Sequence, residues 1–126
     1  MKKTISLLLM TFVIVSIQAV TKVEVYYFHY TRRCETCQAV ESETLKSVKQ
    51  LYPEQFKKGL ITFKSVNLDE KKNKTLADKC KAEGQALLVI SNNKRTDLTE
   101  QGFMYAKDQS DKLKAELNKV IRPLLK

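Results

Sequence analysis

A strand-like segment that leads through a three-residue loop into a Cys-x-x-Cys motif restricts the fold of this chain more than any other feature. The segment Val23–Tyr30 is rich in β-branched and aromatic residues, which predicts a strand buried on both faces. From Cys34 to Tyr52 the apolar residues recur at close to helical spacing, which predicts a helix that stops before Pro53. The motif therefore stands where a buried strand gives way to a helix, and we expect the start of a β-α-β unit.

The rest of the chain continues to alternate between strand and helix patterns. The expected elements are a strand at Leu60–Leu68, a lysine-rich helix at Lys71–Glu83, strands at Ala86–Ile90 and Arg95–Thr99 joined by a tight turn, and a last helix from about Asp108 to Leu125. Asp69 is the expected N-cap of the lysine-rich helix and Gly84 its C-terminal stop, and residues 101–107 are expected to form a loop.

The resulting order of elements is β-α-β-α-β-β-α. We expect its first two crossovers to be parallel and its final hairpin to be antiparallel. Helices must then cover both faces of the sheet. The sequence therefore predicts an α/β fold, a three-layer α/β/α sandwich around a four-stranded mixed sheet.

The first nineteen residues have the pattern of a targeting segment rather than of a folded domain. A basic start at Met1-Lys2-Lys3 precedes an apolar run at Ile5–Ile17, and the small residue Ala19 follows, which is the order found in secretory signal peptides. The run is shorter than the roughly 20 residues of a membrane span. We expect a signal peptide at 1–19, a folded domain at 20–126 and export to the periplasm, where disulfides persist. An uncleaved N-terminal anchor is the alternative.

Charge and composition exclude several classes of function. The sequence has 23 Lys and Arg residues against 14 Asp and Glu residues, a formal net charge of +9. The basic residues are interleaved with acidic ones, without aromatic platforms between them, so we expect a solvated basic surface and no nucleic-acid partner. No membrane span is expected after signal cleavage. A single histidine excludes a metal site built from histidines.

The strongest chemical signal is the motif Cys34-Glu35-Thr36-Cys37. At the N-terminus of a helix, unpaired N–H groups and the helix dipole favour a thiolate on Cys34. Cys37 follows one turn later, within reach of a disulfide. Arg32 and Arg33 add positive charge and are expected to lower the pKa of Cys34 further, while Glu35 opposes them. These features favour a redox-active pair over half of a zinc site or an inert structural disulfide.

Three other groups of residues carry alternatives that the sequence leaves open. His29 is either an acid–base partner of the thiolate or a packing residue. Cys80 lies on a thin apolar stripe, which favours a buried core residue, but it is also a candidate third thiol for a soft ion such as arsenite, with Cys34 and Cys37. Residues 103–105 either cover the site or pack in the core.

From about Val23 to Leu125, the element order and the position of the motif resemble the thioredoxin superfamily. The resemblance implies that Cys34 is the nucleophile and Cys37 the resolving thiol, and that the substrate groove includes Gln85 and Ala86. We expect no cofactor. The sequence departs from that pattern: Arg33 stands in place of Trp, Glu35-Thr36 in place of Gly-Pro, and an apolar or aromatic residue near Phe28 in place of a buried acid. No proline occurs at 83–86, where the superfamily has a cis-proline.

A narrower resemblance rests on Tyr26-Tyr27-Phe28-His29 and on Arg33-Cys34-x-Thr36-Cys37. These segments are similar to exported thioredoxin-like proteins of Bacteroidota described as the F subunit of an arsenic-resistance operon or as a nitrophenyl-compound nitroreductase subunit. The resemblance implies an accessory redox role. The sequence has no flavin or nicotinamide fingerprint.

We therefore expect a thiol–disulfide oxidoreductase that acts on a protein or small-molecule disulfide or thiol with an unidentified redox partner. A non-catalytic thiol protein that binds arsenite or a soft metal is the alternative function.

Overall fold

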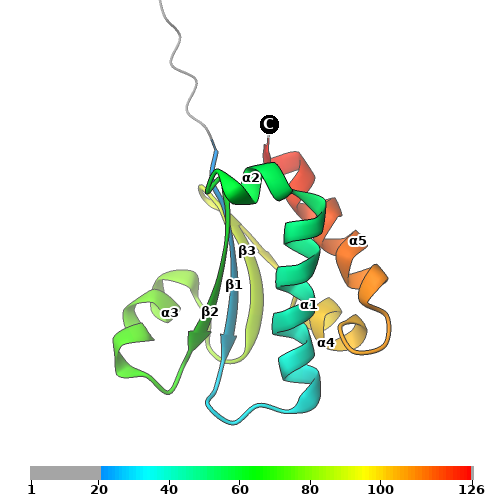
Figure 1. The fold of residues 1–126 in the computed structure, drawn as a ribbon. Helices are drawn as coiled ribbons and strands as arrows, with labels where there is room; N and C mark the ends of the chain where they lie inside the picture. The colour runs from blue at the N-terminus through cyan, green and yellow to red at the C-terminus, as the bar shows by residue number, and fades with distance from the viewer. Residues whose placement is uncertain (1–20, 126) are drawn as a thin grey trace, which may run out of the picture.

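Four strands form one mixed sheet in the order β2-β1-β3-β4 (Figure 1). The structure, a computed structural model, describes residues 21–125, so the expected signal peptide lies outside the described residues. The strands are β1 (Val23–His29), β2 (Ile61–Asn67), β3 (Ala86–Ser91) and β4 (Lys94–Asp97). β1 pairs in parallel with β2 and antiparallel with β3, and β3 pairs antiparallel with β4. The expected four-stranded mixed sheet is confirmed.

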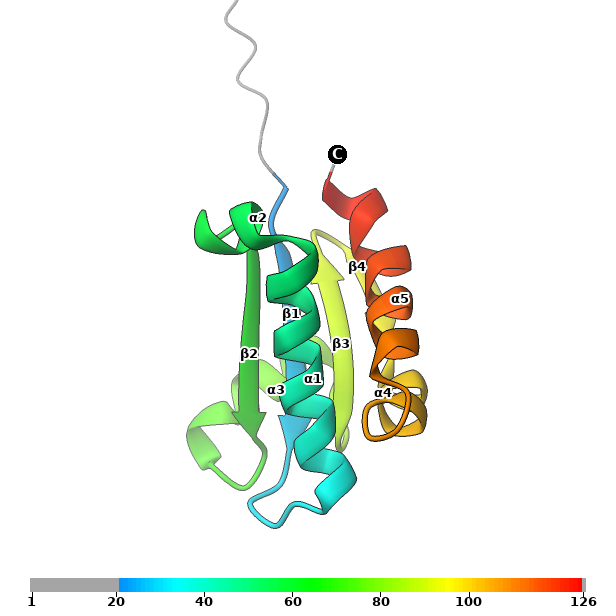
Figure 2. The ribbon, with the colours of Figure 1, turned by 45° about the vertical axis from the view of Figure 1, so that its right-hand side comes forward.

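Helices cover both faces of this sheet. The long helix α1 (Glu35–Leu51) packs on α4 (Thr99–Tyr105) and α5 (Ser110–Ile121) on one face, and the short helix α3 (Lys74–Cys80) covers the other (Figures 1 and 2). Smaller elements complete the chain: α2 (Pro53–Lys57) and the 3-10 turns η1 (Lys71–Asn73) and η2 (Arg122–Leu125). The expected α/β sandwich is therefore present. Within residues 21–125 no helix is long and apolar enough to cross a membrane.

β1 is the centre of both hydrophobic cores. Val25 and Tyr27 point into the larger core, where they meet α1 and α5. Tyr26 and Phe28 point into the smaller core with Ala77 of α3. Because successive side chains of a strand point to opposite faces, a strand between two helical layers has apolar residues at every position. The prediction that this strand is buried on both faces is confirmed.

The expected second parallel crossover is wrong. β3 runs antiparallel to β1, and its first residue, Ala86, pairs with Phe28 near the end of β1. Helix α3 has only seven residues, about 10 Å of helix, whereas returning along a seven-residue strand requires about 23 Å. The chain therefore re-enters the sheet at the end where β2 stops, which is the lower end of the sheet in Figure 1.

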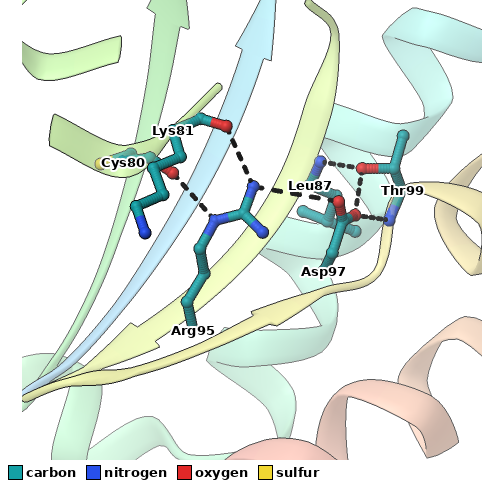
Figure 3. Close-up of polar contacts among 6 residues, drawn as sticks. All are labelled: Cys80, Lys81, Leu87, Arg95, Asp97 and Thr99. Atoms are coloured by element: carbon teal, nitrogen blue, oxygen red, sulfur yellow. Dashed lines mark hydrogen bonds and ion pairs between the residues drawn. The ribbon is translucent and has the colours of Figure 1, made fainter. Parts of the chain in front are cut away.

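The boundaries of the lysine-rich helix also differ from the prediction. Its regular part ends at Cys80, and Lys81 takes the left-handed conformation (φ 56°) in place of the expected Gly84. A non-glycine residue seldom adopts this conformation. Arg95 of β4 holds this end, because its Nε donates to the carbonyl oxygen of Cys80 at 2.9 Å and its Nη2 to that of Lys81 at 3.2 Å (Figure 3). A side chain from a strand thus satisfies carbonyls that the helix leaves open.

A second polar clamp, next to Arg95 in Figure 3, joins β3 to the start of α4. The Leu87 N–H donates to Thr99 Oγ1 at 3.0 Å, and the hydroxyl of Thr99 in turn donates to Asp97 Oδ1 at 2.5 Å. The backbone N–H of Thr99 donates to the same carboxylate oxygen at 2.9 Å. The clamp fixes where the chain leaves β4 for the α4 helix.

The predicted loop at 101–107 is wrong, because most of it belongs to α4. Gly102 resembles a helix breaker in the sequence, but it allows α4 to approach its neighbours closely: a Cβ at this position would lie 3.1 Å from Leu87 Cδ2 and 3.3 Å from Val40 Cγ1. Phe103 packs against the larger core, while Met104 is 55% exposed. The tight turn between β3 and β4 is confirmed, with Asn92 at φ 53°.

Replacing Arg95 with Met should lower the free energy of unfolding by about 1–2 kcal/mol, because two hydrogen bonds from a charged group to the carbonyl oxygens of Cys80 and Lys81 are lost. Lys94→Met is the matched control: it removes the same charge from the same strand at an exposed position, and we expect a change within about 0.5 kcal/mol. Urea unfolding of both variants measures the difference. Equal losses in the two variants would contradict the capping role of Arg95.

Candidate active site

Cys34 and Cys37 form a disulfide at the N-terminus of α1, with their Cα atoms 5.0 Å apart. Cys34 is the N-cap of the helix: its backbone is extended, and its Sγ accepts a hydrogen bond from the Cys37 N–H at 3.1 Å. The sulfur thus occupies the place that a serine or aspartate oxygen takes in an ordinary cap. Such a donor, together with the helix dipole, stabilises negative charge on Cys34 Sγ when the pair is reduced.

The two cysteines differ in access to solvent. Cys34 is exposed, whereas Cys37 is only 4% exposed and lies below it in the first turn of α1. An incoming sulfur can approach Cys34 but not Cys37. This asymmetry separates an attacking thiol from a thiol that acts from inside the protein.

Charged side chains beside the motif are arranged in two pairs. Arg33 forms an ion pair with Glu41, which lies further along α1. Glu35 forms one with Lys107, which follows α4, at 3.3 Å. The positive charge expected from Arg33 is therefore shared with a carboxylate, and the opposing charge of Glu35 is matched by an ammonium group. Arg32 is exposed.

His29 ends β1 and is 6% exposed. Its Nδ1–H donates to the Tyr30 carbonyl oxygen at 2.9 Å, because a carbonyl can only accept, and its ring lies against that of Tyr27 with centroids 5.7 Å apart. His29 also lines a pocket of about 490 Å³ together with Arg33. It therefore packs in the fold and faces a cavity beside the motif.

The carboxylate of Asp69, which follows the end of β2, holds the loop that carries the motif. Asp69 Oδ2 accepts the Thr31 N–H at 2.7 Å, and Asn67 Nδ2 donates to Thr31 Oγ1 at 3.0 Å. The hydrogen bonds from Thr31 lower the pKa of Asp69 from its ordinary value of 3.8. The expected role of Asp69 as a helix N-cap is wrong, because η1 and α3 begin after it and it anchors the loop instead. The polar residues Asn67 and Asp69, at and just after the end of a strand, are the sequence signal for this contact.

Cys80 does not join the disulfide pair. It lies 5% exposed in the smaller core, on the sheet face opposite to α1. Burial, and then the nearby charge of Glu24, raise the pKa of its thiol, so it stays protonated and is a poor ligand. Within residues 21–125 no group of three or more His, Cys, Asp or Glu side chains is placed to hold a metal ion. The sheet therefore separates Cys80 from the Cys34–Cys37 disulfide in this structure.

The expected groove residues reach the same end of the sheet as the motif. Ala86 is buried opposite Phe28, and Gln85 is half-buried in the loop before it. In that loop a Cβ on Gly84 would lie 3.8 Å from the exposed Tyr30 hydroxyl. Thr36 is half-buried beside the cysteines. All peptide bonds in residues 21–125 are trans.

The chain shows a similarity to a solved protein structure. No family model matches the chain, and no curated protein matches it. The chain is similar to a solved structure described as "Structure of a malarial protein", with 24% identity over 78% of this chain and 96% of that chain and a TM-score of 0.49.

Replacing Asp69 with Ala should speed hydrogen exchange at the Thr31 amide, because the loop loses its carboxylate acceptor. The folded pKa of Asp69 is lowered, so its contribution to stability is present above its ordinary pKa and is lost as the pH falls through the lowered value. The stability difference between the natural sequence and Asp69→Ala should therefore shrink on acidification. Asp108→Ala, at another exposed aspartate, is the control. A difference that is independent of pH would contradict the anchor.

Proposed function

We propose that this chain is a thiol–disulfide oxidoreductase of the thioredoxin-like type, with Cys34 as nucleophile and Cys37 as resolving thiol. One observation carries the proposal: an exposed cysteine caps a helix N-terminus and is bonded to a buried cysteine one turn later. A purely structural disulfide has no need of an exposed sulfur that accepts a backbone hydrogen bond.

The exchange reaction follows from the positions of the two sulfurs. In the reduced protein the Cys34 thiolate attacks one sulfur of a substrate disulfide, forms a mixed disulfide and releases the other substrate sulfur as a thiolate, which takes up a proton. The Cys37 thiol then loses its proton and attacks Cys34 Sγ. This step forms the Cys34–Cys37 disulfide and releases the second substrate thiol. The substrate gains two electrons, the protein loses two, and an external dithiol donor restores them.

Thioredoxin-like architecture is part of the proposal. It is supported by the parallel β1-α1-β2 unit, which presents the motif, and by the antiparallel β3-β4 hairpin followed by a C-terminal helix. The accessory role beside arsenic or nitroaromatic chemistry is supported by the sequence resemblance of residues 26–37 alone. We treat it as a proposal about the electron-transfer partner.

Trapping of the mixed disulfide tests the mechanism. The reduced Cys37→Ser variant, treated with bis(2-hydroxyethyl) disulfide, should accumulate an adduct on Cys34 because no resolving thiol remains. The Cys34→Ser variant should react with the reagent at least about tenfold more slowly than the Cys37→Ser variant, because burial protects Cys37. Cys80→Ser should behave like the natural sequence. Mass spectrometry of the intact protein distinguishes these products.

Two results would overturn the proposal. One is equal reactivity of the Cys34→Ser and Cys37→Ser variants, which would remove the division of roles. The other is a reduced protein that unfolds and exchanges with no disulfide, which would assign the bond a structural role.

Export completes the proposal and is supported by the basic, apolar and small-residue order of residues 1–19. Expression of the full chain in a bacterial host should give a periplasmic protein that begins at Val20, as read from its intact mass and N-terminal sequence. Recovery of the full-length chain from the membrane fraction would favour the uncleaved anchor instead.

A further inference from the structure

The structure forms a basic pocket that includes Arg33, the residue before Cys34, and that nothing above requires for thiol exchange. We propose that this pocket binds the carboxylate of a small acidic disulfide or thiol, and that such compounds are the substrate class of the Cys34–Cys37 pair. The inference rests on the proposed function and adds to it the charge and size of the substrate.

The pocket lies where β1 and β2 end and η1 and α3 begin. It measures about 490 Å³, within the range of about 300–1,000 Å³ for small-molecule sites. Residues from β1, β2, η1, α3 and the loops between them line it, among them His29, Arg33, Lys64, Glu70 and Lys72. It therefore suits a compound with a few polar groups better than an extended polypeptide.

Positive charge dominates the lining. Arg33, Lys64 and Lys72 are the basic residues of the lining, and Glu70 is its carboxylate. Lys72 pairs with Glu70 at 3.0 Å. Lys64 forms no ion pair within the described residues and stays available to an anion. With Arg33 paired to Glu41 and Lys72 paired to Glu70, Lys64 carries the positive charge of the lining that no carboxylate of the described residues matches, and an acidic ligand can neutralise it.

His29 gives the pocket a rigid polar wall. The side chain is buried to more than nine-tenths, and its Nδ1–H is committed to the Tyr30 carbonyl oxygen. Nε2 is therefore the ring nitrogen left for a ligand. Stacking against Tyr27 fixes the ring plane, so little rotamer entropy is lost when a ligand binds.

Arg33 connects the pocket to the disulfide. It lines the pocket and directly precedes Cys34 in the chain, and its guanidinium is held by Glu41 of α1. In the proposed complex a small disulfide places its carboxylate beside the lysines and its sulfurs towards Cys34 Sγ. The carboxylate takes no part in the electron transfer: the bonds that break and form are those of the exchange described above.

Three small disulfides of matched size separate the effect of charge from reactivity. The probes are 3,3′-dithiodipropionate (anionic), bis(2-hydroxyethyl) disulfide (neutral) and cystamine (cationic), each mixed with the reduced protein while formation of the Cys34–Cys37 disulfide is followed. We expect the anionic probe to react fastest relative to its rate with free dithiothreitol. The double variant Lys64→Gln/Lys72→Gln should slow that probe by roughly tenfold, since each exposed charge contact contributes up to about fivefold. It should leave the neutral probe unchanged.

The matched control is Lys46→Gln/Lys119→Gln, which removes the same two charges at exposed positions of α1 and α5. If the lysines act only by attracting the anionic probe to the protein surface in general, both double variants will react with it equally slowly. That outcome would overturn the proposal that the pocket binds the probe. Equal normalised rates with all three probes would overturn it as well, while leaving thiol exchange intact.

Binding is measured independently of redox chemistry. The oxidised protein has no thiolate on the pair and is titrated with 3,3′-dithiodipropionate while the ring resonances of His29, the one histidine in the sequence, are followed by NMR. The site is supported, even if no exchange occurs, by saturable shifts with the anionic disulfide. The neutral disulfide should not cause these shifts, and the Lys64→Gln/Lys72→Gln variant should weaken them. Absence of shifts with the anionic probe overturns the inference, whereas failure of every probe to react overturns the proposed function.

Discussion

Burial of β1 on both faces is the constraint on which the rest of the structure depends. The strand pairs with β2 on one side and β3 on the other, and its alternate side chains enter two separate cores. A strand with no face in water is ordered along its whole length, so the loop after His29 leaves from a fixed point. Helix α1 packs on the same strand through Val40 and Val48. The position of Cys34 is therefore fixed by β1 before it and by α1 after it, both of which are held in the core.

The sequence predicted the parts of the fold that local pattern determines. Three local patterns predicted their structures, and the structure confirms each of them: the apolar run at Val23–Tyr30, the helical spacing after Cys34 and the turn at Asn92. The sequence did not predict features that depend on contacts with residues far away in the chain. In the sequence Gly102 resembles a helix breaker, and its role becomes visible only when Val40 and Leu87 lie beside it in the fold. The direction of β3 follows from the short length of α3, which ends before its lysine-rich sequence pattern does.

The same division holds for the site. Adjacent residues and helix geometry were enough to expect a disulfide between Cys34 and Cys37. Contacts between segments far apart in the chain were not foreseen, such as Asp69 with Thr31 or Lys107 with Glu35, because they require knowing which loops meet at one end of the sheet. The role of Cys80 needed the topology as well, since its sequence pattern permitted both a core residue and a ligand.

The seclusion of Cys80 has a consequence for how the chain acquires its disulfide. Three cysteines allow three pairings, but in the folded chain a whole sheet separates Cys80 from the other two. Once α3 has docked, oxidation leads to one product, and no disulfide isomerase is needed to correct it. Mispairing with Cys80 is open to the chain before α3 docks, because the sheet then does not yet separate the three thiols.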